Sequence, residues 1–239
     1  MRAGRRAALR GAARTGLALL VLAQPAKPGT KAVSAMTPPS DQVIPIASAA
    51  SDQDRPAGLL YRLNVGLASG TRLEVRTLLF LTGNRIARTF PFGGGDAFDQ
   101  SRCNPDMCGS YQLDASQITV RWDDGRVDRW PYRRTAEGFE IDGSNYKPAR
   151  PVTQAALIGT WAGAAVTGNA SENVYTFGPD GAFTFGAGRL GVRGRYTVKG
   201  LTLSLAFADG TQQRRTLFAA GSGEPVGLIC VEGDVYRRQ

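Results

Sequence analysis

The residue types that most often perform catalysis are poorly represented in this chain, which contains no histidine. Histidine is the usual general base near neutral pH and the commonest metal ligand in proteins. A Ser-His-Asp or Cys-His arrangement therefore cannot form within this sequence. The sequence also contains no Gly-x-Ser-x-Gly, Walker or dinucleotide-binding motif. We therefore expect a protein that is not an enzyme and that binds no cofactor and no metal ion.

Paired carboxylates are the remaining catalytic option, because glycoside hydrolysis needs only two of them. Asp123 and Asp124 are adjacent, and Asp96 and Asp99 lie close together in a glycine-rich segment. The step from Asp124 to Gly125 is also typical of a tight turn, where an Asp-Gly pair has a conformational role. A carboxylate-based hydrolase is therefore only the third of the functions that we consider.

The cysteines indicate a disulfide rather than a metal site. Cys103 and Cys108 flank an Asn-Pro-Asp-Met sequence, whose turn-forming residues would bring the two thiols together. In an oxidising compartment such a pair forms a disulfide. A zinc site would need a second pair of ligands, and the chain has neither histidine nor a second cysteine pair. Cys230 lies in an apolar run and is expected to be a small buried side chain.

Aromatic residues beside arginines are the best candidates for a binding site. Trp130 and Tyr132 lie beside Arg129 and Arg133, which predicts an exposed aromatic and cationic platform. Packing inside the protein is the alternative for both rings. Trp161 either contributes to a ligand site or plugs the closed end of a barrel. The candidate ligand-binding residues are therefore Trp161, Trp130, Tyr132 and Arg129.

The elements that would position these residues come from an internal duplication. Residues 109–125 and 194–210 share a glycine, a tyrosine, alternating apolar positions and an Asp-Gly turn at a constant offset of 85 residues. A repeat of this kind indicates a duplicated structural unit. Only the first copy contains the long insertion 93–107. Further matches join 141–146 to 231–236 and, more loosely, 79–84 to 175–180.

The repeated unit has the pattern of antiparallel strands. Apolar residues alternate with polar ones at Ile118, Val120 and Trp122, and again through 201–207. Asp-Gly pairs between such segments are hairpin signals, and nothing after residue 57 has a helical period. We therefore predict an all-β fold of two tandem antiparallel meander units, each a β-barrel. One larger continuous barrel built from both repeats is the alternative.

The second copy resembles the bacterial lipocalin-like domains. The resemblance depends on Gly159-Thr160-Trp161, on the segment 175–185, on Gly194-Arg195-Tyr196 and on 234–237. It implies a meandering β-barrel that opens with a Gly-x-Trp strand, and a role in carrying a small ligand or in binding within the cell envelope. The first copy lacks the Gly-x-Trp opening.

Residues 1–26 have the form of a secretory signal peptide, in which arginines precede a short apolar core. That core, residues 16–23, is shorter than the roughly 20 residues that a membrane-crossing helix needs, so we expect no stable membrane span. The alternative is that translation starts at Met36. Together with the cysteine pair, this leader predicts a periplasmic or secreted protein.

Three further segments follow the signal peptide. Residues 27–57 are rich in Pro, Ala, Ser and Thr and are expected to form a flexible linker. The first β-repeat unit is expected to span 58–150, and the second 151–239. Each unit is large enough for one small core.

The positive charge of the chain does not predict nucleic-acid binding. The formal net charge is +9, but seven of the 29 basic residues lie in 1–40, which contains no acid. The remaining 22 basic residues face 20 acids. A nucleic-acid-binding domain normally concentrates basic charge on one face.

Two functions remain, and neither partner nor oligomeric state follows from the sequence. The first is binding of a small apolar or amphipathic ligand in a barrel. The second is an envelope or extracellular protein-interaction module with packed barrels, whose contact surface is the loop 93–108. A cavity of about 300 Å³ or more favours the first.

Overall fold

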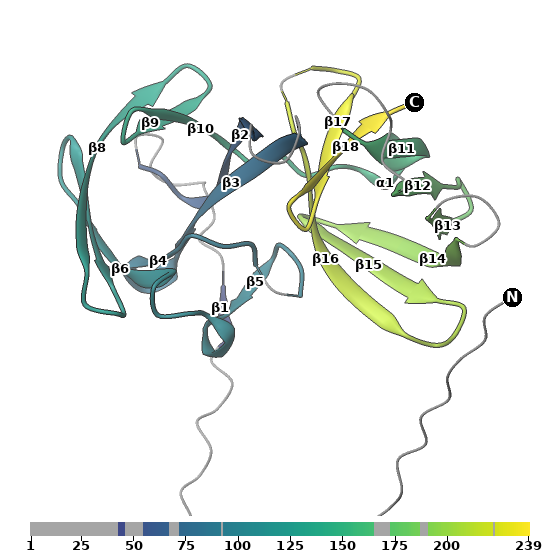
Figure 1. Ribbon diagram of the computed structural model, residues 1–239, viewed down its shortest axis with the longest axis horizontal. Helices are drawn as coiled ribbons and strands as arrows, with labels where there is room; N and C mark the ends of the chain where they lie inside the picture. Colours follow the sequence, from purple (N-terminus) through teal and green to yellow (C-terminus); the bar gives the residue numbers. More distant parts are fainter. Residues whose placement is uncertain are drawn as a thin grey trace, which may run out of the picture. The chain divides into compact units, whose positions relative to one another are not determined.

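Within the described residues, the chain forms two closed antiparallel β-barrels of eight strands each, one after the other in sequence. The computed structural model describes residues 43–45, 55–66, 72–91, 93–164, 173–186, 191–221 and 223–239. Figure 1 draws the first barrel in blue and teal and the second in green and yellow. The predicted all-β fold with two separate barrels is confirmed, and the alternative of one continuous barrel is wrong.

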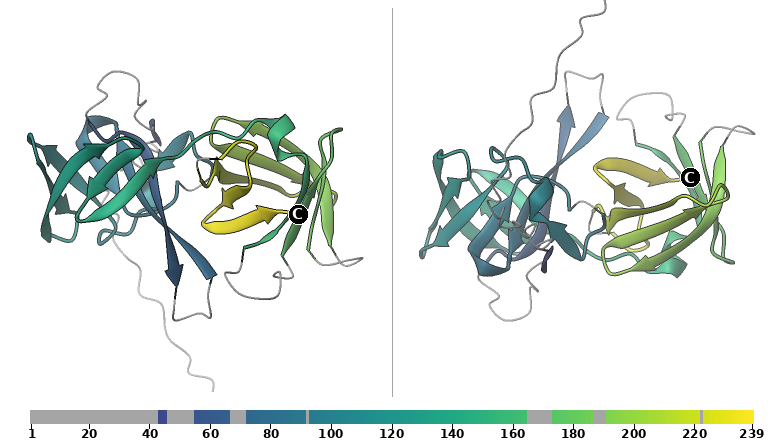
Figure 2. Two further views of the ribbon diagram at one scale, coloured as in Figure 1. Left: turned by 90° about the horizontal axis from the view of Figure 1, so that it is seen from above. Right: turned by 90° about the horizontal axis from the view of Figure 1, so that it is seen from below.

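The first barrel is built by β2–β4 and β6–β10. The bounds of these strands are β2 Gly58–Gly66, β3 Arg72–Leu81, β4 Arg85–Ala87, β6 Cys108–Leu113, β7 Gln117–Trp122, β8 Val127–Thr135, β9 Gly138–Ile141 and β10 Ser144–Pro148. A short 3-10 helix, η1 (Thr82–Asn84), joins β3 to β4. The barrel closes because β10 pairs with both β9 and β2. The long β2–β3 hairpin projects past the neighbouring strands (Figure 2).

The insertion of the first copy has secondary structure of its own. Strand β5 (Ala97–Asp99) pairs antiparallel with β1 (Val43–Pro45), and the 3-10 helix η2 (Gln100–Arg102) follows. β1 lies inside the segment that the sequence predicts to be a flexible linker. A two-stranded sheet has only edge strands, where a proline is tolerated because its missing N–H need not be paired.

The second barrel follows a short helix, α1 (Gln154–Leu157). Its strands are β11 Gly159–Gly163, β12 Val174–Phe177, β13 Ala182–Phe185, β14 Val192–Lys199, β15 Thr202–Phe207, β16 Gln212–Ala219, β17 Leu228–Val231 and β18 Asp234–Arg238. Pairing of β11 with β18 closes it. The order of strands around this barrel is the same as around the first, so the duplicated sequence corresponds to a duplicated topology.

A repeated glycine shows why the two copies keep the same residue at the same place. Gly109 in β6 lies against the Arg121 carbonyl of β7, and Gly194 in β14 lies against the Ala206 carbonyl of β15. A Cβ atom at either position would overlap that carbonyl group. Glycine is therefore required by the close approach of neighbouring strands in both barrels.

Each barrel has a core of inward-facing side chains. The core of the first contains Leu60, Phe80, Ile86, Ile118, Val120, Trp122, Trp130, Phe139 and Ile141. The core of the second contains Trp161, Tyr175, Phe177, Phe183, Tyr196, Leu203, Leu205, Leu217 and Tyr236. Ile118 and Leu203, which the duplication matches, occupy equivalent buried positions in β7 and β15.

A third core joins the two barrels and is built from outward-facing side chains. Leu59, Tyr61 and Leu79 of the first barrel pack with Phe218 and Cys230 of the second. The ring centroids of Tyr61 and Phe218 are 4.8 Å apart, and the Tyr61 hydroxyl accepts a hydrogen bond of 2.8 Å from the backbone N–H of Gly221. The strands concerned are therefore apolar on both faces, as strands covered on both sides are.

The predicted disulfide between Cys103 and Cys108 is confirmed. Their Cα atoms are 6.1 Å apart, within the usual range for a disulfide. The backbone N–H groups of Met107 and Cys108 both bond to the Asn104 carbonyl, at 2.8 and 3.1 Å. The turn predicted from the intervening residues is thus what brings the two cysteines together.

Cys230 is buried in the third core, and burial raises the pKa of its thiol. Because the thiolate is the reactive form, we expect iodoacetamide to leave Cys230 unmodified in the folded protein at neutral pH. In denaturant without reductant, one alkylated cysteine should appear by peptide mass spectrometry. The bridged cysteines serve as an internal control, since they react only after reduction. Alkylation of Cys230 in the folded protein would contradict the packing of the third core.

No helix within the described ranges has the length and apolar character needed to cross a membrane.

Candidate ligand-binding site

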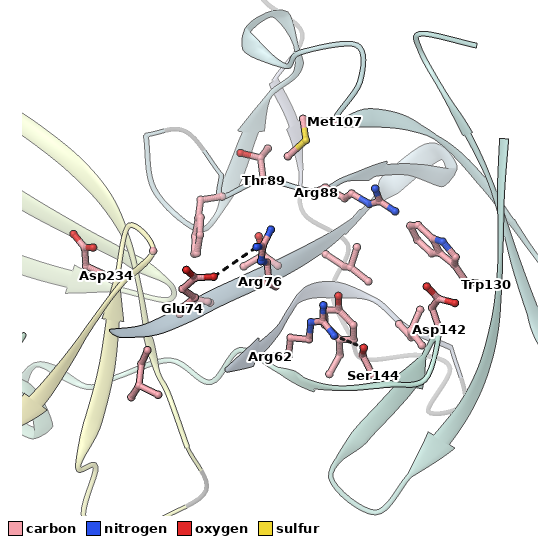
Figure 3. Close-up of a pocket in the computed structure, with 18 residues that line it drawn as sticks. Arg62, Glu74, Arg76, Arg88, Thr89, Met107, Trp130, Asp142, Ser144 and Asp234 are labelled. Atoms are coloured by element: carbon pink, nitrogen blue, oxygen red, sulfur yellow. Dashed lines mark hydrogen bonds and ion pairs between the residues drawn. The ribbon is translucent and has the colours of Figure 1, made fainter. Parts of the chain in front are cut away.

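A cavity of about 780 Å³ opens at one end of the first barrel (Figure 3). This end carries the turn between β9 and β10 and the segment that follows β4. The wall is made by residues of β2, β3, β8, β9 and β10 and of the segment that follows β4, together with Gly233 and with Asp234 at the start of β18. We call this cavity the mouth. Its volume lies in the range of small-molecule sites.

The deeper wall of the mouth is apolar. Leu78, Trp130 and Ile141 belong to the core of the first barrel and also line the cavity. Trp130 is only 6 % exposed, and its ring lies 5.9 Å from that of Trp122. Phe90, in the segment that follows β4, also lines the cavity. An apolar part of a ligand would therefore find partners at the inner end of the cavity.

Three arginines from three segments line the outer part of the mouth (Figure 3). Arg62 of β2 and Arg76 of β3 are direct cross-strand neighbours. Like charges in such a pair destabilise the sheet. Arg88 follows β4, and its guanidinium lies 4.6 Å from the ring centroid of Trp122 and 4.9 Å from that of Trp130.

Two of these arginines have a carboxylate partner within the barrel. Arg88 Nη2 lies 3.2 Å from Asp128 Oδ2, which also accepts a 2.8 Å hydrogen bond from Trp122 Nε1. Arg76 Nη2 lies 3.6 Å from Glu74 Oε2, and both side chains are largely in contact with solvent. The Arg76 pair therefore contributes little stability, whereas the Arg88 pair is fixed by the indole.

Arg62 differs from the other two because it pairs with no carboxylate among the described residues. It donates to the Ser144 hydroxyl, and its guanidinium lies 5.4 Å from the ring centroid of Tyr146. Its Nε is buried and has no hydrogen-bond partner in the described part of the chain. A buried donor without an acceptor is costly, so this atom marks a position where an acceptor is missing.

The three arginines of the mouth also affect the pKa of Tyr146. Burial raises the pKa of its hydroxyl, and the nearby Arg62, Arg88 and Arg76 guanidinium groups oppose part of that rise. Tyr146 is therefore an uncharged phenol at neutral pH. Its ring can stack on a guanidinium or on a ligand, but it adds no negative charge to the mouth.

The residues of the predicted aromatic and cationic platform on β8 do not share one face of the strand. Trp130 points into the mouth, whereas Arg129 points outwards and is exposed. Tyr132 faces inwards, but it lines a separate cavity of about 580 Å³ together with Arg134. The expectation of one exposed aromatic and cationic surface at Trp130, Tyr132 and Arg129 is therefore corrected, because successive residues of a strand face opposite sides.

Trp161 lies in the core of the second barrel and is fully buried. Its Nε1 donates a 2.7 Å hydrogen bond to the Leu157 carbonyl, and the Arg238 guanidinium lies 4.6 Å from its ring centroid. In the first barrel, the equivalent cross-strand position is held by Leu60. The structure therefore places Trp161 as a packing residue beside α1 and not beside Trp130.

Sequence reasoning did not identify Arg62, Arg88, Ser144 or Tyr146. The match of 141–146 to 231–236 pairs Tyr146 with Tyr236 of the second copy, and such a repeated residue indicates a structural role. The available signal for Arg62 was its position in the alternation of the strand. Arg62 lies two residues after Leu60 and so shares its inward face, where a second apolar residue would be expected. Arg88 lies between β4 and the insertion 93–107, where no repeat pattern places it.

The carboxylates that were considered for catalysis make structural contacts. Asp123 accepts two hydrogen bonds from Arg85, of 2.9 and 2.5 Å, and Asp124 accepts one of 2.6 Å from Arg126. Asp96 accepts a 2.7 Å hydrogen bond from the Thr202 hydroxyl of the second barrel. In the described residues, no three or more Cys, Asp or Glu side chains are grouped so that they could hold a metal ion.

Comparisons of this chain with protein-family models, with curated proteins and with solved structures found no significant match.

Proposed function

We propose that this protein is an exported, non-enzymatic β-barrel protein that binds a small amphipathic molecule in the mouth of the first barrel. The observation that carries the proposal is a cavity of about 780 Å³ that has an apolar inner wall and many charged and polar side chains around it. Its volume and its apolar part are features of small-molecule sites, and the charged side chains suit an amphipathic molecule. The cavity exceeds the roughly 300 Å³ that we expect of a ligand carrier.

The remaining parts of the proposal have separate support. The closed eight-stranded barrels and the strand containing Gly159 and Trp161 favour a lipocalin-like domain. The bridge between Cys103 and Cys108 favours a periplasmic or secreted protein, because disulfides persist in oxidising compartments.

The protein-interaction module has less support, because part of its expected contact surface is used within the chain. Gly94 and Gly95 are buried against Thr202 and Leu201 of the second barrel. Phe98 is fully buried in the third core. This part of the loop 93–108 therefore packs within the chain and is not available to a partner.

Filling the mouth should abolish ligand binding without unfolding the protein. Thr89 lines the cavity at its outer side, so we expect Thr89→Trp to place an indole in the space that a ligand would occupy. The neutral fluorophore N-phenyl-1-naphthylamine should bind the unaltered protein with one-to-one stoichiometry. Its affinity should fall about tenfold or more in the variant, which corresponds to about 1.4 kcal/mol or more. Fluorescence titration measures both values.

Thr119→Trp is the matched control, because Thr119 lies on the outer face of β7 and pairs with the exposed Arg129. This variant adds the same indole outside the cavity and should bind the fluorophore normally. Absence of binding to the unaltered protein, or equal affinities in all three proteins, would contradict the proposed site.

A further inference from the structure

We infer that the ligand of the mouth is a monoanion with an apolar tail, a carboxylic acid whose head is held by Arg62. This inference rests on the proposed function, since it names the class of molecule that the same cavity would take. It depends on three features of the mouth: the pairing of its arginines, the missing acceptor at Arg62 and the position of the apolar wall.

The three arginines of the mouth differ in how they are paired. Arg88 is paired with Asp128, and Arg76 lies beside Glu74. Arg62 has no carboxylate partner within the described residues and faces Arg76 directly across the strand pair. A single negative charge between the two guanidinium groups would relieve their repulsion and neutralise Arg62.

The hydrogen bonding of Arg62 fits a carboxylate. A guanidinium presents its N–H groups in a planar fork that matches the two oxygens of a carboxylate. Nη1 is occupied by the Ser144 hydroxyl, while Nε has no acceptor in the described part of the chain. Because Nε is buried, a ligand in the cavity can accept its hydrogen bond only if the guanidinium turns towards the cavity. A charged acceptor supplies the stronger hydrogen bond that favours this turn.

The apolar wall fixes the direction of the tail. Leu78 lies two residues beyond Arg76 on the same inward face of β3, further from the opening. Trp130 and Ile141 line the same inner region. A head held at Arg62 would therefore leave the tail against these three side chains, with water excluded from it.

Two acidic residues at the rim favour a monoanion over a dianion. Asp142 and Asp234 both line the opening and are exposed. Solvent screens their charges, but they add no attraction for a second negative charge. A phosphate monoester carries close to two charges at neutral pH, whereas a carboxylate carries one, as Arg62 requires.

The test compares three ligands with the same tail: dodecanoate, dodecanol and dodecyl phosphate. Each displaces N-phenyl-1-naphthylamine from the unaltered protein, from Arg62→Gln and from Arg129→Gln. We expect the unaltered protein to bind dodecanoate about 10- to 100-fold more tightly than dodecanol, as a charge-assisted hydrogen bond would give. Arg62→Gln should remove this preference, and the exposed Arg129→Gln should keep it. The preference should also disappear below a pH of about 4–5, where the acid is protonated.

The binding of dodecanol reports whether Arg62→Gln is folded, since the alcohol needs only the apolar wall. If that variant binds neither ligand, Arg62→Lys keeps the charge without the fork and should retain only part of the preference. Equal affinities for acid and alcohol in the unaltered protein would overturn this inference and leave the proposed function intact. A preference for dodecyl phosphate would overturn the monoanion assignment. Failure of all three ligands to displace the fluorophore would overturn both proposals.

Discussion

Replacing Trp161 by alanine is expected to lower the free energy of unfolding by about 3–5 kcal/mol, the range for truncating a fully buried large aromatic residue. The side chain is completely enclosed in the second barrel, and its indole N–H is bonded to the Leu157 carbonyl. The substitution leaves a cavity, an unpaired carbonyl group and an Arg238 guanidinium without its aromatic partner. Chemical denaturation followed by circular dichroism measures the change.

Two variants separate packing from general destabilisation. Trp161→Phe keeps most of the ring but loses the N–H donor, so a smaller loss of about 1–2 kcal/mol is expected. Val192→Ala changes an exposed side chain of the same barrel and should stay within about 0.5 kcal/mol of the unaltered protein. If Trp161→Ala changes the free energy of unfolding as little as Val192→Ala, packing of the indole does not stabilise the second barrel.

Replacing Phe218 by alanine should uncouple the unfolding of the two barrels. Phe218 lies on the outer face of the second barrel, is fully buried in the third core and contacts the Tyr61 ring of the first barrel. We expect the unaltered barrels to unfold in one transition because they share this core. The variant should lose about 3–5 kcal/mol and unfold in two steps. Differential scanning calorimetry distinguishes one transition from two.

The control for this variant is Val127→Ala. Val127 lies on β8 of the first barrel and is 42 % exposed, so its truncation should change stability by no more than about 0.5 kcal/mol. It should also leave a single transition. Two transitions already present in the unaltered protein would mean that the third core does not couple the barrels.

The strands were predictable because their signals are local. Gly109 and Gly194 recur at the same offset as the turns that follow them, and the close approach of neighbouring strands explains both glycines. The alternation at Ile118, Val120 and Trp122 identifies one buried face of β7, and the structure has that face inside the barrel. Residues that repeat and alternate report their own backbone environment, so no tertiary information was needed.

The weakest part of the repeat was misaligned by one residue. The match of 79–84 to 175–180 aligns Leu81 of the first copy with Phe177 of the second. In the corresponding hairpins of the two barrels, however, Phe80 pairs with Ile86 and Phe177 pairs with Phe183. Phe80 and Phe177 are therefore the equivalent inward residues. Because side chains on a strand alternate between faces, an error of one residue moves every side chain to the wrong side.

The residues of the candidate site could not be predicted for a similar reason, since the site depends on which side chains face inwards and on which distant strands pair. Trp130 and Arg129 are neighbours in sequence, and nothing in their types decides which one faces inwards. Arg62 and Ser144 are far apart in sequence and meet only because β10 closes the barrel against β2. Pairing across the closing strands is a long-range property, so no local pattern contained it.

The sequence by itself determined the duplication, the meander of strands, the hairpin turns and the disulfide, since each depends on residues close together in the chain. Only the tertiary structure decided that the barrels are separate, that they share a third core and that three arginines line one cavity with Trp130. These features depend on which faces of distant strands come into contact. That choice is made by the burial of apolar surface over the whole molecule and by no single segment.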